Sequence, residues 1–181
     1  MGYGHTFPRM RKITNEEWTA ITQDVRALIN ALPPHSSSAG AFYVERPLAL
    51  TFDDEDGVIH SGAFIDHDHI VFNGDPSMDL DYEEFFVDRN SVDPYGRNNP
   101  EIPFGLDYCK TERKPYDLVV CAVLAVMEDR APGGWNIDSD GGIDDWQPAL
   151  AWASEVLGRD LVSPVPKHAN ASAPTQPTMS P

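Results

Sequence analysis

The sequence predicts an α+β protein in which an antiparallel sheet packs against about three helices, followed by a disordered C-terminal tail. Three observations lead to this expectation. Two segments repeat apolar residues at helical spacing and a third is apolar on all sides, short runs of alternating apolar residues lie between Gly- and Asp-containing turns, and the C-terminal end is dominated by Pro, Ala, Ser and Thr. We therefore expect a single domain over residues 1–160 and a disordered tail over residues 161–181.

The first elements are a short strand and a helix. Residues Gly2–Phe7 alternate small or polar residues with aromatic ones, which indicates a strand. Thr14, followed three residues later by Glu17, is typical of a capping box, and apolar residues then recur at helical spacing until Pro33. The first helix is therefore expected over about residues 15–32.

A Ser-rich loop over His35–Gly40 and a group of short strands are expected next. Gly- and Asp-containing turns separate the strands, a pattern that favours an antiparallel meander. A surface loop rich in Asn, Pro and Gly follows over Asn90–Pro103. The predicted strands are Ala41–Glu45, Leu48–Phe52, Val58–Phe64, His69–Asn73 and Tyr82–Asp88.

Two more helices are expected in the second half of the chain. One has Pro115 in its first turn and runs to about Asp129, with apolar residues all around its axis, so it should lie in the core. The other is capped by Asp144 or Asp145 and ends at Gly158. The short strands predicted in this half are Leu106–Thr111 and Trp135–Asp138.

The composition excludes several classes of function. The formal net charge is −16 at pH 7, so a nucleic acid or an anionic membrane would be repelled. The longest apolar run, Leu118–Met127, is about half of what a membrane-spanning helix needs. Two cysteines are too few for a disulfide framework, and no secretion signal opens the chain. We expect a cytoplasmic protein that binds neither nucleic acid nor membrane.

Acidic residues are concentrated in one part of the chain. Between Asp53 and Asp88 there are twelve Asp or Glu residues and no Lys or Arg. Such a face can imitate a nucleic-acid backbone and bind a basic protein, or it can be a solvated sheet edge that resists aggregation. The sequence leaves both interpretations open.

A cluster of basic residues, Lys110, Arg113 and Lys114, precedes the expected N-terminus of the central helix. Unpaired backbone N–H groups and the helix dipole favour an anion there. The ammonium of Lys110 and the hydroxyl of Thr111 suit a phosphate or a carboxylate, and Tyr116 is available to stack on a base. The alternative is a pair of surface charges beside a buried Tyr.

Metal binding and nucleophilic catalysis have weaker support. Asp66–His69 alternates Asp and His, but on a strand the two types point to opposite faces, so a solvated hairpin tip is favoured. Asp138–Gly141 resembles the start of a calcium loop, yet no Glu completes the pattern, and helix capping is favoured. We expect no metal and no cofactor. Cys109 is a candidate nucleophile, because the adjacent Lys110 and a helix N-terminus would lower the pKa of its thiol.

Several short motifs are distributed along the chain. They are Gly2-Tyr3-Gly4-His5, the helix that bears Trp18, Phe72-Asn73-Gly74, Tyr108-Cys109-Lys110-Thr111, Lys114-Pro115-Tyr116-Asp117, and Ser139-Asp140-Gly141 before Trp146. Together they resemble a family of small proteins encoded by phages and bacterial plasmids. The resemblance covers about Gly2 to Leu157 and does not reach the tail.

The resemblance implies that the polar signature residues converge in a pocket between strand ends and helix N-termini. Such a pocket would bind a small phosphorylated ligand, a nucleotide or a nucleotide-derived signal, in an accessory or counter-defence protein of the bacterial cytoplasm. The candidate ligand-binding residues are His5, Asn73, Lys110, Thr111, Lys114, Tyr116, Asp117, Ser139 and Asp140.

Two other hypotheses stand beside this one. The first is an interaction protein whose acidic face, Asp53–Asp88, binds a basic host protein as a nucleic-acid mimic. The second is a nucleotide-processing enzyme, with His5 or Cys109 as the reactive group and Asp117 or Asp140 as the orienting acid. The sequence itself does not decide whether the protein is an enzyme, but it favours a non-catalytic binding protein.

Overall fold

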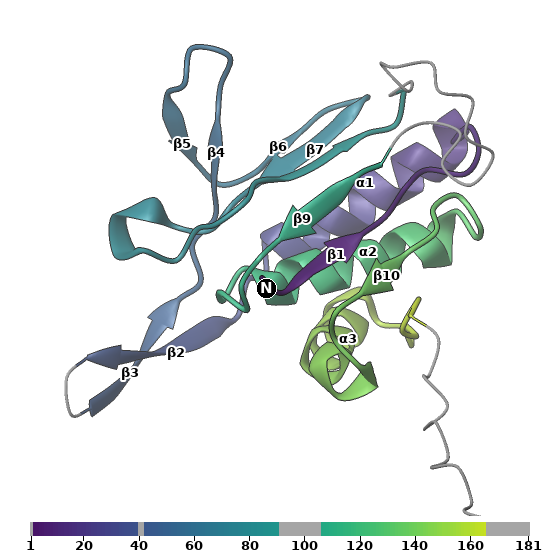
Figure 1. Ribbon diagram of the computed structural model, residues 1–181. Coiled ribbons are helices and arrows are strands. Elements are labelled where there is room, and N and C mark those ends of the chain that lie inside the picture. Colours follow the sequence, from purple (N-terminus) through teal and green to yellow (C-terminus); the bar gives the residue numbers. More distant parts are fainter. Residues whose placement is uncertain (1, 40–41, 91–105, 166–181) are drawn as a thin grey trace, which may run out of the picture.

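Three helices and several small antiparallel sheets make up the part of the chain that the structure describes, which confirms the α+β prediction (Figure 1). The structure is a computed structural model and describes residues 2–39, 42–90 and 106–165. Most of the predicted tail and nearly all of the predicted surface loop lie outside these ranges.

The helix α2 (Asp117–Arg130) lies at the centre of the molecule. Every residue from Val119 to Met127 is buried, because apolar side chains surround the helix axis, as the sequence predicts. The helices α1 (Asn15–Ile29) and α3 (Ile143–Leu157) pack against α2 and against each other. The core is therefore built around α2.

The first helix begins as the sequence predicts. Thr14 Oγ1 accepts a hydrogen bond from the Glu17 amide at 3.2 Å, and Glu17 Oε2 accepts one from the Thr14 amide at 2.9 Å. These two bonds complete the capping box. The helix ends at Ile29, before the predicted end at Leu32.

The third helix ends at Gly158 as predicted, with this glycine in the left-handed conformation at φ 65°. The predicted N-cap of this helix, Asp144 or Asp145, is wrong, because the N-cap is Gly142. Asp145 Oδ2 accepts a hydrogen bond from the Gly142 amide at 2.9 Å. The carboxylate acts from the third helical position, where an acidic side chain reaches back to the cap.

A three-stranded antiparallel sheet lies against α2, with its strands in the order β10-β1-β9 (Figure 1). The central strand pairs His5 with Cys109 on one side and with Ser139 on the other. The sheet thus joins three segments that are far apart in the sequence. Its strands are β1 (Gly4–Thr6), β9 (Tyr108–Lys110) and β10 (Asp138–Ser139).

The predicted strands between residues 48 and 88 form, but they divide between two small sheets rather than one meander. An isolated bridge between Thr51 and Asn73 joins the two sheets. A short 3₁₀ helix, η1 (Pro76–Met78), precedes the strand over Phe85–Asp88. One sheet is the hairpin of β4 (Thr51–Asp53) and β5 (Ile59–Ser61), and the other contains β6 (Phe64–Ile65), β7 (His69–Phe72) and β8 (Phe85–Asp88).

The predicted Ser-rich loop over residues 35–40 is wrong. Its described part belongs to β2 (Pro34–Ala39), which pairs with β3 (Phe42–Pro47) along its whole length. Ser has a low strand propensity, but pairing with a neighbouring strand overrides such local preferences. The hairpin extends away from the helices (Figure 1).

The folded chain continues beyond the predicted domain boundary at residue 160. Leu161 and Val165 are both buried in the main hydrophobic core. The expected disorder of the tail over residues 161–181 is therefore wrong for Leu161 and Val165. None of the helices that the structure describes is both long and apolar enough to span a membrane.

Candidate functional site

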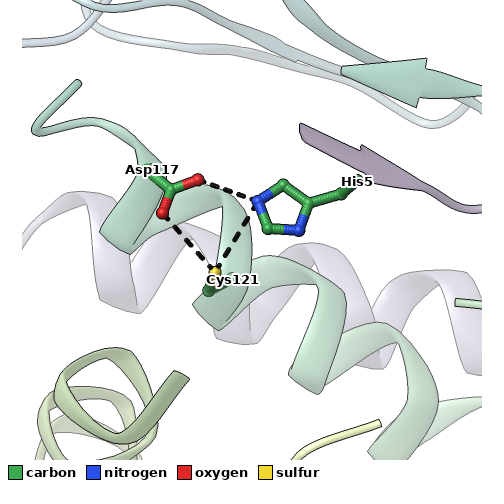
Figure 2. A group of neighbouring side chains, drawn as sticks. All are labelled: His5, Asp117 and Cys121. Atoms are coloured by element: carbon green, nitrogen blue, oxygen red, sulfur yellow. Dashed lines mark hydrogen bonds and ion pairs between the residues drawn. The ribbon is translucent and has the colours of Figure 1, made fainter. Parts of the chain in front are cut away.

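Four side chains meet beneath β1 at the first turn of α2, and Figure 2 shows three of them, His5, Asp117 and Cys121. His5 Nε2 lies 2.8 Å from Asp117 Oδ1, which also accepts a hydrogen bond from Thr111 Oγ1 at 2.6 Å. Cys121 Sγ lies 3.9 Å from His5 Nε2 and 4.0 Å from Asp117 Oδ2. Asp117 retains 17% side-chain exposure, whereas the other three side chains are buried. We call these four residues the buried cluster.

Regular secondary structure positions three of these residues. His5 is the middle residue of β1 and is held from both sides by strand pairing. Asp117 and Cys121 are four residues apart on α2, so they share one face of the helix. The cluster therefore needs no irregular backbone at these positions.

The turn between β9 and α2 positions the fourth residue. Glu112 and Arg113 have positive φ values of 49° and 58°. The amides of Thr111 and Glu112 both donate to the carbonyl oxygen of Tyr3, at 3.0 and 3.1 Å. These two bonds tie the turn to the start of β1, and the Thr111 hydroxyl consequently faces Asp117.

Aromatic rings enclose the imidazole of His5. The rings of Tyr3 and Trp146 approach it edge-on, with centroids at 5.4 and 5.6 Å. His5 Nδ1 is buried and has no hydrogen-bond partner among the described residues. Burial raises the pKa of the Tyr3 hydroxyl, and the nearby Asp117 carboxylate raises it further. The guanidinium of Arg113 lies over the Tyr3 ring, with its Cζ atom 4.0 Å from the ring centroid.

The opposite face of the same sheet carries a shallow groove of about 210 Å³, which we call the outer groove. Tyr108 and Lys110 flank the buried Cys109 on β9, so their side chains point away from α2. Four of the predicted ligand-binding residues line this groove, namely His5, Lys110, Ser139 and Asp140. The other lining residues are Gly2, Gly4, Thr6, Leu106, Tyr108 and Asp138.

The outer groove is not a strongly cationic site. Lys110 Nζ lies 3.7 Å from Glu83 Oε1, which offsets its charge. Asp138 and Asp140 line the same groove. Asp140 Oδ2 accepts a hydrogen bond from the Gly4 amide at 3.0 Å and so joins β1 to the loop after β10.

Lys114 and Asp117 line a separate cavity of about 350 Å³, so the predicted residues do not form one pocket. Lys114 Nζ lies 3.4 Å from Asp79 Oδ1 and also donates to the Asp79 carbonyl oxygen. Arg113 lines this cavity as well and pairs with Asp145. The positive charges of the predicted cluster are thus compensated within the protein.

Two other predicted residues stabilise the fold. Asn73 Oδ1 accepts hydrogen bonds from the amides of Gly74 and Tyr82 at 2.8 and 3.2 Å, which shapes the loop after β7. Tyr116 is fully buried and donates to the Glu83 carbonyl oxygen at 2.8 Å. The proposed stacking of a base on Tyr116 is therefore wrong.

The amides in the first turn of α2 already have partners. The Asp117 amide donates to the Lys114 carbonyl oxygen at 2.9 Å, and the Leu118 amide donates to that of Pro115 at 3.4 Å. These bonds replace the unpaired N–H groups that the sequence interpretation assigned to an anion. The helix N-terminus therefore offers few free donors to a ligand.

Cys109 does not have the character of a nucleophile. It is fully buried, and Cys109 Sγ donates to the Glu83 carbonyl oxygen at 3.4 Å. Burial raises the pKa of the thiol to about 12. The expected lowering of this pKa is wrong, because desolvation outweighs the hydrogen bond with Tyr116 and the nearby carboxylates raise the pKa further.

Sequence reasoning missed two residues that belong to these sites. Tyr108 is half exposed and lies two positions before Lys110 on β9, a spacing that puts both on one face. Cys121 lies four positions after Asp117 on a predicted helix, which also puts both on one face. Both spacings were visible in the sequence.

A third feature is an acidic cleft of about 470 Å³ between the β4-β5 hairpin and the β6-β7-β8 sheet. Phe64 and Phe86 remain 41% and 45% exposed there. No Lys or Arg is among its lining residues, which are Phe52, Asp53, Asp54, Glu55, Phe64, His69, Val71, Glu84 and Phe86.

The carboxylates of the acidic cleft repel each other. Burial raises the pKa of Glu84, and the negative charge of Asp53 raises it further, although the Asp53 amide donates to Glu84 and lowers it. The pKa of Glu84 is raised overall. A cation in the cleft would relieve this repulsion.

The turn at Asp66–Asp68 is a solvated hairpin tip, as predicted. Asp66 Oδ1 accepts hydrogen bonds from the amides of Asp68 and His69 at 2.8 and 2.7 Å. The His67 side chain is 83% exposed. These residues form the turn between β6 and β7.

Comparison with known proteins adds no relative. No protein-family model matches the chain, and no curated protein or solved structure matches it either.

Proposed function

We propose that the protein binds a basic segment of a partner protein in the acidic cleft. The lining of the cleft is the observation that carries this proposal. Exposed Phe rings stand beside four carboxylates, and neither Lys nor Arg is among the lining residues. The proposal follows the sequence hypothesis of an acidic interaction protein.

A Lys or Arg side chain fits the chemistry of the cleft. Its cationic head is attracted to the faces of Phe64 and Phe86. Carboxylates such as Asp53 and Glu84 bind the same head by charge-assisted hydrogen bonds. The cleft volume of about 470 Å³ lies within the range of ordinary ligand pockets.

The charge of the whole chain favours the same class of partner. A net charge of −16 accelerates the approach of a basic protein and slows that of an acidic one. The resemblance to phage- and plasmid-encoded proteins suggests which partner this is. It would be a nucleic-acid-binding protein in the cytoplasm of the bacterial host. The chain would then act as a nucleic-acid mimic with a counter-defence role.

Fluorescence anisotropy with a labelled peptide of mixed Lys and Arg tests this proposal. Phe86→Ala and Glu84→Gln should each weaken binding about five- to tenfold, because each removes one contact worth about 1 kcal/mol. Tyr108→Ala and Glu155→Gln are matched controls, since both residues are exposed outside the cleft. Equal weakening by Glu84→Gln and Glu155→Gln would show diffuse attraction and no cleft site.

A second candidate function is the binding of a small phosphorylated ligand, a nucleotide or a related signal, in the outer groove. It is favoured by Tyr108 and Lys110, which present a ring and an ammonium on one face of β9. The groove of about 210 Å³ is smaller than the roughly 300–1,000 Å³ of ordinary pockets, so part of the ligand would lie over Tyr108.

Native mass spectrometry of the protein purified from bacterial cells tests the second candidate. A phosphorylated compound that leaves on denaturation would support it. Binding of that compound should be lost in Lys110→Ala and kept in Lys12→Ala, because Lys12 is an exposed lysine outside the groove. Retained affinity in Lys110→Ala would exclude this assignment.

A further inference from the structure

We propose that His5, Asp117 and Cys121 bind one zinc ion or a similar first-row divalent cation beneath β1. One ligand atom from each side chain lies within 4.8 Å of the other two. Figure 2 shows the imidazole, the carboxylate and the thiol turned toward a common point. This inference does not depend on the acidic cleft or on the outer groove.

The separations of the donor atoms suit a single ion. Tetrahedral zinc with bonds of about 2.0–2.3 Å places its ligand atoms about 3.3–3.6 Å apart. Here Nε2 and Oδ1 are 2.8 Å apart, and Sγ lies 3.9 Å from Nε2 and 4.0 Å from Oδ2. To bind one ion, the Nε2–Oδ1 separation has to widen by about half an ångström and the Sγ separations have to shorten by a few tenths of an ångström.

The surrounding structure holds the ligands in place before any ion binds. His5 sits in the middle strand of a sheet, and Asp117 and Cys121 share one face of the buried helix α2. Thr111 Oγ1 donates to Asp117 Oδ1 at 2.6 Å and orients that carboxylate. Such a partner outside the ligand set is usual at metal centres.

The chemistry of the donors selects the class of metal. A thiolate, an imidazole and a carboxylate together suit zinc, cobalt and related ions, whereas magnesium and calcium require oxygen ligands. The site is also enclosed, because the side chains of His5 and Cys121 are buried. A hard, strongly hydrated ion would lose its water shell there without adequate compensation.

Asp117 connects the proposed metal site to a cavity. It lines the cavity of about 350 Å³ beside Arg113 and Lys114. Three protein ligands leave a fourth tetrahedral position, and the access from this cavity allows a water molecule or an added ligand to occupy it. Zinc sites with three protein ligands and an open position are typically the reactive ones.

Metal binding displaces protons in a defined way. The Cys121 thiol loses its proton on binding. The Nε2 atom of His5 becomes a ligand, so the imidazole proton resides on Nδ1. The Oδ1 contact of Asp117 with His5 is replaced by the shared ion, while the Thr111 hydrogen bond is retained.

Titration of the metal-free full-length chain with Co²⁺ tests the proposal directly. We expect one equivalent of Co²⁺ to bind, with tetrahedral visible bands and a thiolate-to-cobalt charge-transfer band in the near ultraviolet. Zn²⁺ should displace it and abolish both signals. If the wild-type chain gives neither band, the four residues form a hydrogen-bonded core cluster only and the proposal is wrong.

Two cysteine variants identify the ligand. Cys121→Ala should lose the charge-transfer band, whereas Cys109→Ala, which changes the other buried cysteine, should keep it. A band that persists in Cys121→Ala overturns the assignment. Asp117→Asn keeps the shape of the side chain, so if Cys121→Ala fails to fold, at least tenfold weaker Co²⁺ binding in Asp117→Asn supports the site and unchanged binding overturns it.

Discussion

The hydroxyl of Tyr3 occupies the space that a side chain at Gly141 would need. A Cβ atom built at position 141 would lie 2.2 Å from Tyr3 Oη and 3.0 Å from its Cζ. Only glycine at position 141 leaves room for the Tyr3 ring that packs against His5, so this glycine is a packing requirement of the buried cluster.

Gly141→Ala should therefore lower the free energy of unfolding by about 1–3 kcal/mol, as expected when a well-packed site is overfilled. The measurement is urea denaturation followed by tryptophan fluorescence. Gly142→Ala is the matched control, since a Cβ there meets nothing within 4 Å. The double variant Tyr3→Phe, Gly141→Ala should recover part of the loss, because it removes the atom that clashes. Equal losses in both glycine variants would contradict this explanation.

Thr111→Val should cost about 1–2 kcal/mol of stability. The substitution keeps the shape of the buried side chain but removes the donor to Asp117 Oδ1. Thr19→Val on the exposed face of α1 is the control and should change stability by less than about 0.5 kcal/mol. A Thr111→Val variant as stable as the wild type would show that water replaces this hydrogen bond.

Asp107→Asn should stabilise the protein at neutral pH. Burial raises the pKa of Asp107 to about 6, although Arg9 acts to lower it. In the unfolded chain the pKa is about 3.9, so the free energy of unfolding falls as the pH rises from about 4 to about 6. We expect a gain on the order of 1 kcal/mol at pH 7 after allowance for solvent screening, and none at pH 3.

Thermal denaturation at several pH values measures this effect. The control is Asp160→Asn, which changes an exposed Asp in the segment after α3. A gain in Asp107→Asn that is the same at pH 3 and pH 7 would contradict the role of ionisation.

Asp24→Asn should destabilise the packing of α1 on α2. Asp24 accepts hydrogen bonds at 2.6 Å from Arg130 Nε and from Arg159 Nη2. Burial acts to raise the pKa of Asp24, but these two arginines outweigh it and the pKa is lowered. The loss at pH 7 should be about 1–3 kcal/mol.

The pH dependence of this loss has a definite sign. A carboxyl group with a lowered pKa in the folded state stabilises the protein above its unfolded pKa of about 3.9. That contribution disappears as the pH falls through the folded value. Chemical denaturation of both proteins between pH 2 and pH 7 should therefore give curves that converge in acid, and a constant difference would contradict the ion pairs.

Local signals explain why the helices were predictable and parts of the sheets were not. The capping box at Thr14, the uniformly apolar segment of α2 and the stop at Gly158 all depend on nearby residues. β2 was missed because its stability comes from pairing with β3, which local propensity does not describe. The division into small sheets is likewise set by contacts between distant residues.

The candidate site was predictable only in part, for the same reason. His5, Thr111 and Asp117 were singled out from motifs and do meet in the buried cluster. Lys110 and Lys114 were grouped with them because they are close in sequence. Strand alternation turns Lys110 to the other face of the sheet. The acidic partners of Lys110 and Lys114, which are Glu83 and Asp79, come from distant parts of the chain.

The position of β1 also constrains how the chain acquires its structure during synthesis. This strand leaves the ribosome long before either neighbour exists, since Gly4 bonds to Asp140 across 136 positions. Its backbone groups must remain solvated or be shielded until β9 and β10 emerge, because contacts so distant in sequence form slowly and late. Translation speed and chaperone access therefore bear on the yield of this protein, independently of its final stability.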